Sequence, residues 1–518
     1  PRASSRPSAR YTRPVLQAQR QWRCREAPPE VVAELEHDLG LAPLIARLLA
    51  VRGVHDADTA QAFLGRRLAD LHKPEALRDC RKAAQRLARA LRDRERILIH
   101  GDYDVDGSTA AALLVRFCRA CSHQATAWIP HRRIDGYGLG EASLEAAREH
   151  RAQLVITVDC GIADHGWARR IEAEVGCDVL ITDHHLPQGD LPSCTAVVNP
   201  NHPGCTSVDK GLAGVGVAWK LAWATAVELS GAERVTDRLR AFLMDALALV
   251  AVGTICDCAP LTGENRILVT HGLRALAATA NPGLRALLSH TRLEDPISAT
   301  DVGWKIGPLL NASGRVGSAM ANIDLLATED RIQADTVLEG IIAENEERKR
   351  LTQVLTDDLS GRLDRDPGLA QRNGLVFAGR DWHAGVVGIV ASRLVERYGK
   401  PTAVIAIQDG VGKGSLRTVP QVHLGEAIEA CRPLLLRGGG HAMAAGLSIA
   451  EDRIDAFREA FDQHISARMS PGALAPRTEH DGDATMADLD HDFFSELERL
   501  GPFGTGNPEP VLRLCAVS

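Results

Sequence analysis

The sequence has no long apolar run without charge. Its most apolar stretch, residues 243–256, is interrupted by Asp245, which leaves residues 246–256 uncharged. A bilayer span needs about 18 to 20 such residues, so we expect no membrane-spanning segment. Residues 1–25 contain seven arginines and no acid but no apolar segment, unlike a secretory signal. We interpret residues 1–30 as a solvated basic arm, with an organelle transit peptide as the alternative.

Cysteine is also scarce, with 12 residues among 518 and no regular spacing. Cys118 and Cys121 have metal-hook spacing, but they lie in an apolar run and no second pair follows at zinc-ribbon distance. We therefore expect reduced thiols in a cytoplasmic protein and two thiols on a helix, in place of disulfides or a zinc site.

An excess of positive charge is missing as well. The 60 basic and 67 acidic residues leave a net charge of −7, so any nucleic-acid partner must be held locally. The 45% apolar and 25% charged residues are typical of globular chains. At about 150 residues per domain, the length predicts two to four domains.

Short buried strands alternate with helical patterns in the first half of the chain, which predicts an α/β domain with a parallel sheet. The expected strands are residues 96–100, 154–158, 179–182 and 196–198. A long charged helix then predicts a connector to a second, smaller α/β domain, and the last residues begin a β-rich module. The expected divisions are residues 1–30 (arm), 31–330 (first domain), 331–366 (connector), 367–468 (second domain) and 469–518 (linker and β-rich module).

Groups that bind hard metals follow the strands of the first half. In an open parallel sheet, ligands collect at the carboxyl ends of the strands. Each group alone has an ordinary interpretation: a surface turn, a core histidine or a helix cap. Together they predict an Mn²⁺ or Mg²⁺ site, because carboxylate and imidazole ligands without thiolates suit these ions. The residues are His100, Asp102, Asp104, Asp106, Asp159, Asp183, His184, His185 and Asp257.

The spacing of these residues resembles the four-motif pattern of the DHH phosphoesterase superfamily. Within it, the surrounding residues are similar to those of the RecJ single-strand-specific exonucleases, from about residue 30 to residue 518. The segments that carry the likeness are 99–107, 129–132, 136–138, 311–315, 382–389, 414–417, 439–441 and 501–508. The sequence departs from that pattern at Cys256 and Cys258, which flank Asp257.

The resemblance implies a site for two ions, Mn²⁺ or Mg²⁺, with roles for individual residues. His100 and Asp104 would hold one ion. Asp106, His184 and Asp257 would hold the other, and Asp159 would bridge them. We expect Asp102 and Asp183 to orient histidines or waters, and His185 to donate to the scissile phosphate.

A second set of residues in family-matched positions would bind the substrate. Arginine forks and a serine hydroxyl suit a terminal phosphate, and glycines beside them let a backbone approach closely. The expected residues are Arg132, Arg315, Ser415, Arg417 and His441. Any one of the arginines could instead be an ordinary surface residue.

The resemblance implies a second α/β domain of the DHH-associated type and an OB-fold that begins at residues 501–508. Only ten residues follow residue 508, so we expect the OB-fold to be incomplete in this chain. The implied function is a 5′-to-3′ exonuclease that degrades single-stranded DNA to mononucleotides in DNA repair and recombination. The expected partners are single-stranded DNA, a single-strand-binding protein and a helicase, with no membrane and a monomeric state.

Two alternatives remain open. A small-substrate DHH phosphoesterase would cleave oligoribonucleotides or a cyclic dinucleotide, but such members lack the β-rich module. An inactive replication scaffold would have no reason to keep six mutually repelling metal-binding side chains.

Overall fold

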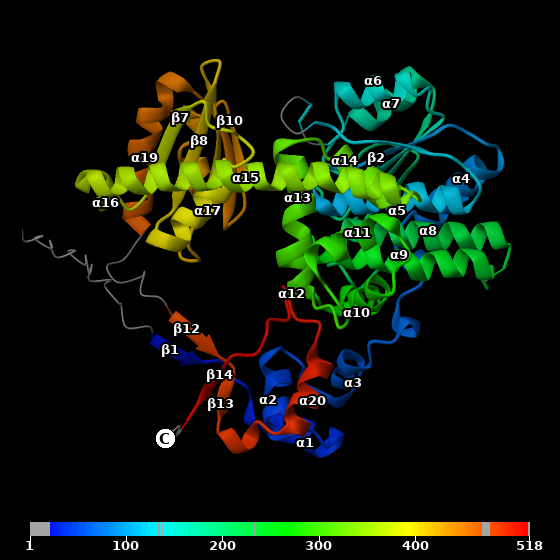
Figure 1. Cartoon of the computed structure of the whole chain (residues 1–518), viewed down its shortest axis with the longest axis horizontal. Coiled ribbons are helices and arrows are strands. Elements are labelled where there is room, and N and C mark those ends of the chain that lie inside the picture. The colour runs from blue at the N-terminus through cyan, green and yellow to red at the C-terminus, as the bar shows by residue number, and fades with distance from the viewer. Residues whose placement is uncertain are drawn as a thin grey trace, which may run out of the picture.

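The computed structural model describes residues 21–131, 135–136, 138–164, 166–232, 234–468 and 477–515. Figure 1 shows two α/β bodies joined by one long helix, and a third body below them. The third body contains both blue and red segments, so it combines early and late parts of the chain.

The first domain is built on a five-stranded sheet with the order β3-β2-β4-β5-β6, and every pairing in it is parallel. The sequence prediction of a parallel α/β domain is therefore confirmed. The runs of aliphatic residues in the strands are buried because helices cover both faces. The strands are β2 (Ile97–His100), β3 (Thr126–Trp128), β4 (Leu154–Val158), β5 (Asp178–Thr182) and β6 (Ala196–Val198).

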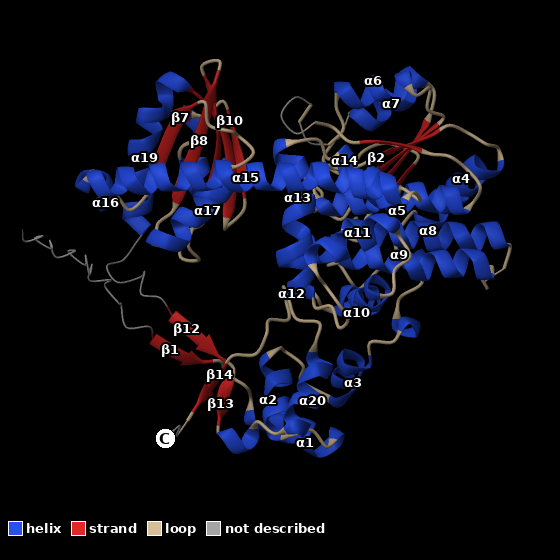
Figure 2. Ribbon diagram, in the orientation of Figure 1, coloured by secondary structure: helices blue, strands red, loops and turns tan. Residues whose placement is uncertain are grey.

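Alternate residues of each strand pack against different helices. Ile99 and Ile156 belong to the larger core, which includes α4, α5, α8 and α9, whereas Leu98 and Val155 pack with α6 and α7 on the opposite face. Figure 2 shows the red strands enclosed by blue helices. The helices are α4 (Cys80–Arg92), α5 (Val105–Ala120), α6 (Glu141–Glu149), α7 (Trp167–Val175), α8 (Gly214–Ser230) and α9 (Asp237–Cys256).

Further helices extend this core below the sheet. They are α10 (Gly263–Ala277), α11 (Pro282–Thr291), α12 (Ala299–Asp301), a π-helical turn (Val302–Ile306), α13 (Gly307–Val316) and α14 (Met320–Ala327). One described helix, α9, is long and apolar enough to cross a membrane by length and composition. However, 61% of its apolar segment is buried, and it contacts α5, α8 and α10, so core packing accounts for its composition.

The predicted connector is helix α15 (Arg331–Arg365), which packs on α13 and α14 at one end and on α17 at the other. The second domain that follows has the sheet order β10-β11-β9-β8-β7, in which only the β7–β8 pairing is parallel. Its elements are α16 (Pro367–Gln371), β7 (Leu375–Arg380), α17 (Val387–Tyr398), β8 (Thr402–Gln408), β9 (Val411–Arg417), α18 (Leu424–Ala430), β10 (Arg437–Gly440), β11 (Ala444–Ala450) and α19 (Ile454–Arg468).

The third body, which we call the terminal module, joins residues 21–65 to residues 477–515. Leu35 and Leu48 share one core with Phe493 and Leu500, and β1 pairs in parallel with β12. Figure 1 shows α1, α2 and α3 beside α20. Its elements are β1 (Gln21–Cys24), α1 (Pro29–Leu39), α2 (Pro43–Val51), α3 (Ala57–Gly65), β12 (Arg477–His480), β13 (Gly482–Ala484), α20 (His491–Leu500) and β14 (Leu512–Leu514).

This module corrects two predicted boundaries. Residues 21–30 are not a solvated arm, because they supply strand β1 and the start of α1. Residues 31–65 belong to this module, because their apolar side chains share a core with α20, and they contact the first domain at α10, where Arg266 lies over the Phe63 ring. The remaining residues of the predicted arm, 1–20, and residues 469–476 at the start of the predicted linker lie outside the described residues. The rest of that linker, which was predicted to end at Asp483, forms β12 and the start of β13.

Candidate active site

The acidic loop after β2 is anchored by two helix N-termini. Asp104 caps α5, since its Oδ1 accepts a hydrogen bond from the Gly107 backbone N–H at 3.0 Å. Asp106 is fully buried and accepts hydrogen bonds from the N–H groups of Gly214 at 2.7 Å and Val215 at 2.8 Å, at the start of α8. Both carboxylates are thereby held at the carboxyl edge of the sheet.

Asp159 follows β4 directly and adopts a left-handed backbone conformation, with φ of +61°. Its carboxylate lies against the start of α8, where a Cβ on Gly214 would be 2.7 Å from Asp159 Oδ1. Only glycine leaves room for this approach. The strained backbone and the tight packing fix the carboxylate between α8 and the end of β5.

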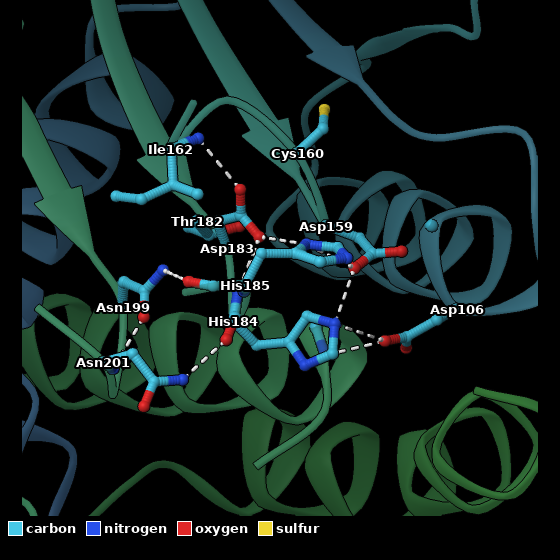
Figure 3. A network of polar contacts seen from close by, with 12 residues as sticks. Asp106, Asp159, Cys160, Ile162, Thr182, Asp183, His184, His185, Asn199 and Asn201 are labelled. Atoms are coloured by element: carbon cyan, nitrogen blue, oxygen red, sulfur yellow. Dashed lines mark hydrogen bonds and ion pairs between the residues drawn. The ribbon is translucent and has the colours of Figure 1, made fainter. Parts of the chain in front are cut away.

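Asp183 follows β5 and organises the two histidines after it, as Figure 3 shows. Its Oδ1 accepts hydrogen bonds from the N–H groups of His184 at 2.7 Å and His185 at 3.0 Å, and contacts His185 Nδ1 at 2.8 Å. Its Oδ2 accepts one from Ile162 at 2.9 Å. Burial opposes the charged form, but these bonds and the charge of His185 hold the pKa of Asp183 below its usual range.

The two histidines have opposite protonation. Burial alone would lower the pKa of His185, but its hydrogen bond and ion pair with Asp183 raise that pKa to about 9. Burial and the charge of His185 lower the pKa of His184 to about 4, so His184 is neutral near pH 7. The site thus holds one imidazolium and one neutral imidazole in adjacent positions.

His184 has the orientation of a metal ligand. It makes a backbone hydrogen bond with Leu212, which leaves Nε2 as the nitrogen that faces the carboxylates. Nε2 lies 3.2 Å from Asp159 Oδ1 and 3.9 Å from both Asp106 Oδ2 and Asp257 Oδ2. Within the described part of the chain, this buried nitrogen has no hydrogen-bond partner.

Three carboxylates around His184 carry raised pKa values. Burial and the charges of neighbouring carboxylates raise the pKa of Asp106 and of Asp159 well above the usual range. Burial and Asp104 raise the pKa of Asp257, the C-cap of α9, to about 7. A divalent cation would relieve this repulsion and occupy the free lone pair of His184, so the residues fit a hard metal ion.

Three groups of side chains place their ligand atoms close enough to share a metal ion. They are Asp106 with His184 and Asp257, Asp159 with His184 and His185, and Asp102 with Asp104 and Asp159. The first group contains the three residues predicted to hold the second ion. Asp159 occurs in the other two groups and not in the first, so its bridging role stays a prediction.

His100 lies apart from these groups among the described residues. It is fully buried, with Nε2 2.9 Å from Ser143 Oγ and Nδ1 3.6 Å from Cys160 Sγ. Burial lowers its pKa to about 4. Asp102, expected to orient other groups, takes the place beside Asp104 instead. The ligand role of His100 stays a prediction, whereas the geometry favours Asp102.

Several supporting groups were missed by sequence reasoning. Ser143 and Cys160 hold His100, and the N–H groups of Gly214, Val215 and Ile162 hold carboxylates. Backbone donors carry no side-chain signal. The glycines at 211, 214 and 216 before a helical run were the available hint of a close approach.

The predicted phosphate-binding residues converge on the start of α17. A Cβ on Gly388 would lie 3.3 Å from Arg417 Nη2 and 3.4 Å from Ser415 Oγ, so both strand residues meet the first turn of that helix. Arg315, in the last turn of α13, reaches across from the first domain and contacts the Gly385 carbonyl oxygen at 3.5 Å. Helix N-termini attract anions, so this is a suitable phosphate site.

The other two predicted substrate residues are His441 and Arg132. His441 is exposed in the turn between β10 and β11, and its backbone N–H donates to the Ala444 carbonyl. Ala444 pairs with Arg417 in the sheet, which places the turn near the same edge. Arg132 lies outside the described residues.

Comparison with known proteins agrees with this arrangement. Residues 96–254 match the DHH family, N-terminal domain, residues 371–467 match the DHHA1 domain and residues 480–518 match the RecJ OB domain. The chain is 36% identical over 500 residues to a single-stranded-DNA-specific exonuclease RecJ of Bacillus subtilis, covering 96% of this chain and 62% of that relative. It is 38% identical over 492 residues to RecJ of Dickeya dadantii, covering 92% and 84%.

Solved structures show the same fold with metal ions. The RecJ of Thermus thermophilus in complex with Mn²⁺ is 32% identical, with a TM-score of 0.81 over 95% of this chain and 69% of that one. The Mg²⁺ complex of RecJ from Thermus thermophilus gives a TM-score of 0.73 over 95% and 67%. With these identities, and with the three domains in the same chain, this protein belongs to the RecJ family of single-stranded-DNA-specific exonucleases.

Proposed function

We propose that this chain is a metal-dependent exonuclease that hydrolyses single-stranded DNA from its 5′ end to 5′-mononucleotides. The observation that carries the proposal is the presence of two separate sites. A carboxylate and imidazole cluster lies at the sheet edge of the first domain, and a phosphate-binding site lies at the start of α17 in the second domain. One would act on a phosphodiester while the other holds the end of the strand.

The side chains divide the chemical work. Asp104, Asp106, Asp159, His184 and Asp257 would hold the cation or cations. A bound Mn²⁺ or Mg²⁺ ion would supply a water of lowered pKa and would polarise the phosphodiester. The cluster of acidic side chains would otherwise repel the substrate, so charge neutralisation is part of substrate binding.

His185 gives this site a positive charge that comes from the protein and not from a bound metal ion. Its pKa of about 9 keeps it protonated near neutral pH, and 47% of its side chain is exposed. It would donate a hydrogen bond to a non-bridging oxygen of the scissile phosphate, where negative charge increases in the transition state. Asp183 fixes the ring and keeps the proton on it.

Recognition of the 5′ end would come from the second domain. Ser415 supplies a hydroxyl, Arg417 a guanidinium, and the first turn of α17 backbone N–H groups, which together suit a terminal phosphate with several acceptor oxygens. Arg315 would contact the adjacent phosphate from the first domain. This arrangement gives the strand a direction.

A small-substrate phosphoesterase is less well supported, since residues 480–518 match the RecJ OB domain, which serves a longer ligand. An inactive scaffold is less well supported too, because Asp106, His184 and Asp257 keep their ligand atoms close enough to share a metal ion. We further propose a cytoplasmic location, a monomeric state and a role in DNA repair and recombination beside a single-strand-binding protein and a helicase. The 12 free cysteines are consistent with a reducing compartment.

The test is degradation of oligonucleotides labelled at either end, with Mn²⁺, with Mg²⁺ and with a chelator. We expect 5′-labelled mononucleotides to be released first from single strands, and nothing from duplexes or in chelator. Release of the 3′ label first would contradict the direction. Preferential cleavage of dinucleotides over long strands would favour the small-substrate alternative.

A further inference from the structure

The π-helical turn Val302–Ile306 packs directly on the end of α9 that carries Asp257. A Cβ on Gly303 would lie 3.7 Å from Ile255 Cγ2, and one on Gly307 would lie 3.0 Å from Cys256 Sγ. Helical turns of this type are rare and occur often at functional sites. The turn is therefore close to the metal site without contributing a ligand to it.

Trp304 projects from this turn into solvent. Its exposed fraction is 79%, whereas Trp219 in the core is 5% exposed. A tryptophan normally buries its large ring, so an exposed one next to an active site needs an explanation. Nothing in the hydrolysis described above uses it.

The turn also borders the terminal module. A cavity of about 140 Å³ lies between the two, lined by Trp304, Ile255, Leu261, Phe503 and Thr505 among others. The Leu261 N–H donates to the Thr505 carbonyl at 2.7 Å, and this hydrogen bond joins the first domain to the terminal module beside the cavity. Trp304 thus borders the domain that matches the RecJ OB domain, on a turn that packs against Ile255 and Cys256, just before Asp257.

The surroundings favour a single flat ligand over a protein surface. Trp304 is the one exposed large apolar side chain of the described residues that lines this cavity, whereas an interface for a protein is marked by a contiguous apolar patch. The cavity is smaller than the roughly 300 to 1,000 Å³ typical of small-molecule sites, which leaves room for one ring.

The described charged residues beside this cavity do not form a phosphate site. Lys305, the cation next to Trp304, is held by Asp301 at 2.8 Å, and Thr300 at the cavity donates to Glu509 at 3.3 Å. The cavity therefore offers little net attraction for a phosphate. The remaining interaction is the face of the indole, on which any base can stack.

We propose that Trp304 stacks on a base of the single-stranded substrate as the strand passes between the terminal module and the metal site. This inference rests on the proposed function, because it takes single-stranded DNA as the substrate. The stacked ring would hold the strand at a fixed distance from the cleavage point. Because any base can stack on it, the contact would not depend on the DNA sequence.

Binding is best measured with the unsubstituted metal-loaded protein and strands whose linkages near the 5′ end resist hydrolysis, so that the oligonucleotide stays intact. Abasic nucleotides are placed one at a time along a 5′-phosphorylated strand, and affinity is compared for Trp304 and for Trp304→Leu. We expect one position at which loss of the base weakens binding about 5- to 150-fold, the range for one stacked base. In Trp304→Leu, removal of the base at that position should no longer change the affinity. Trp304→Phe should retain most of the effect.

Two controls make the result specific. Phe494→Leu changes another exposed aromatic, on α20, and should leave the abasic profile unchanged. The slope of log affinity against log salt should be the same with and without Trp304, because stacking releases no counterions.

An identical abasic profile in Trp304→Leu would overturn the inference, and so would an equal loss of affinity for every oligonucleotide. Self-association that depends on Trp304 in sedimentation would also overturn it, because the ring would then contact a second copy. If the unsubstituted protein fails to cleave single strands at all, the proposed function itself fails, which separates the two results.

Discussion

His184 Nε2 and Asp159 Oδ1 lie 3.2 Å apart, although 25 residues separate them in the chain. The register of the sheet produces this contact. Val158 at the end of β4 pairs with Thr182 at the end of β5, so the residues just beyond both strands leave the sheet at the same edge. Because the other nitrogen of His184 bonds to the Leu212 backbone, a lone pair on Nε2 faces the carboxylate, and a cation between the two would remove that repulsion.

Removal of the charge at Asp159 should abolish activity. Asp159→Asn keeps the shape of the side chain but removes a ligand shared by two groups, so Mn²⁺-dependent cleavage should fall more than about 100-fold, beyond the loss typical of outer-shell partners. Calorimetric titration with Mn²⁺ should show the matching loss of binding. Asp492→Asn, at an exposed position on α20, is the control. Cleavage within tenfold of the unsubstituted enzyme, in a folded variant, contradicts the metal role.

Asp183→Asn should shift the pH dependence of cleavage. Asp183 keeps the pKa of His185 at about 9, so the enzyme should lose activity at alkaline pH as His185 loses its proton. Without that carboxylate, the pKa of His185 should fall toward the ordinary value of about 6.5. The alkaline limb of kcat/KM should therefore move to lower pH. Superimposable alkaline limbs would show that His185 does not act as a proton-bearing donor.

Metal removal should have a pH-dependent effect on stability. The pKa values of Asp106 and Asp159 are raised, and that of Asp257 is about 7, so these three carboxylates bind more protons in the metal-free native state than in the unfolded chain from about pH 4 to 7. They outnumber His100 and His184, whose lowered pKa values act in the opposite direction. The free energy of unfolding of the metal-free protein should fall as pH rises through that range. Mn²⁺ replaces those protons, so scanning calorimetry should show a larger increase in Tm with Mn²⁺ near pH 8 than near pH 5.5. Equal increases would mean that these carboxylates do not bind the ion.

Arg417→Ala should impair recognition of the 5′ phosphate more than the chemical step. One charge-assisted hydrogen bond contributes about 1.5 to 3 kcal/mol, or roughly ten- to hundred-fold in affinity. The loss should be large with a 5′-phosphorylated strand and small with a 5′-hydroxyl strand. Arg380→Ala, an exposed arginine of the same domain that pairs with Glu451, should change neither. An equal loss on both strands places the phosphate elsewhere.

Arg266→Met should destabilise the protein. The guanidinium of Arg266 is buried and donates to the carbonyl oxygens of Phe63, Arg499 and Leu500 at 3.0, 3.0 and 2.8 Å. Loss of these bonds leaves buried carbonyls without donors, so the free energy of unfolding should fall by at least about 3 kcal/mol. Arg513→Ala, which breaks an exposed ion pair with Asp483, should have little effect on the free energy of unfolding. If urea unfolding shows similar losses of stability for both variants, the three hydrogen bonds of Arg266 do not contribute the expected stability.

The sequence predicted the sheet and its acidic edge because each strand is a short aliphatic run followed directly by a metal-binding group. Such local patterns specify β4 and β5, and parallel strands then bring Asp159 and Asp183 to one edge. The choice between His100 and Asp102 as a partner of Asp104 was not predictable in this way. It depends on Ser143, which reaches His100 from a helix 43 residues later.

The terminal module was not predicted for a related reason. Strand β1 has four residues, and its partner β12 lies more than 450 residues away, so no local pattern connects them. Arg266 also looks like an ordinary polar position in a helix, and only the fold reveals the three carbonyls around it.

The pairing of β1 with β12 sets an order of events during synthesis on the ribosome. At about 5 to 20 residues per second, β12 is translated roughly 20 to 90 seconds after β1. During that interval Leu35 and Leu48 have no cover from Phe493 and Leu500. The apolar faces of the early helices therefore stay exposed and accessible to chaperones until residues 477–515 have been synthesised. Both α/β domains can complete their cores before then, so this module becomes native after them.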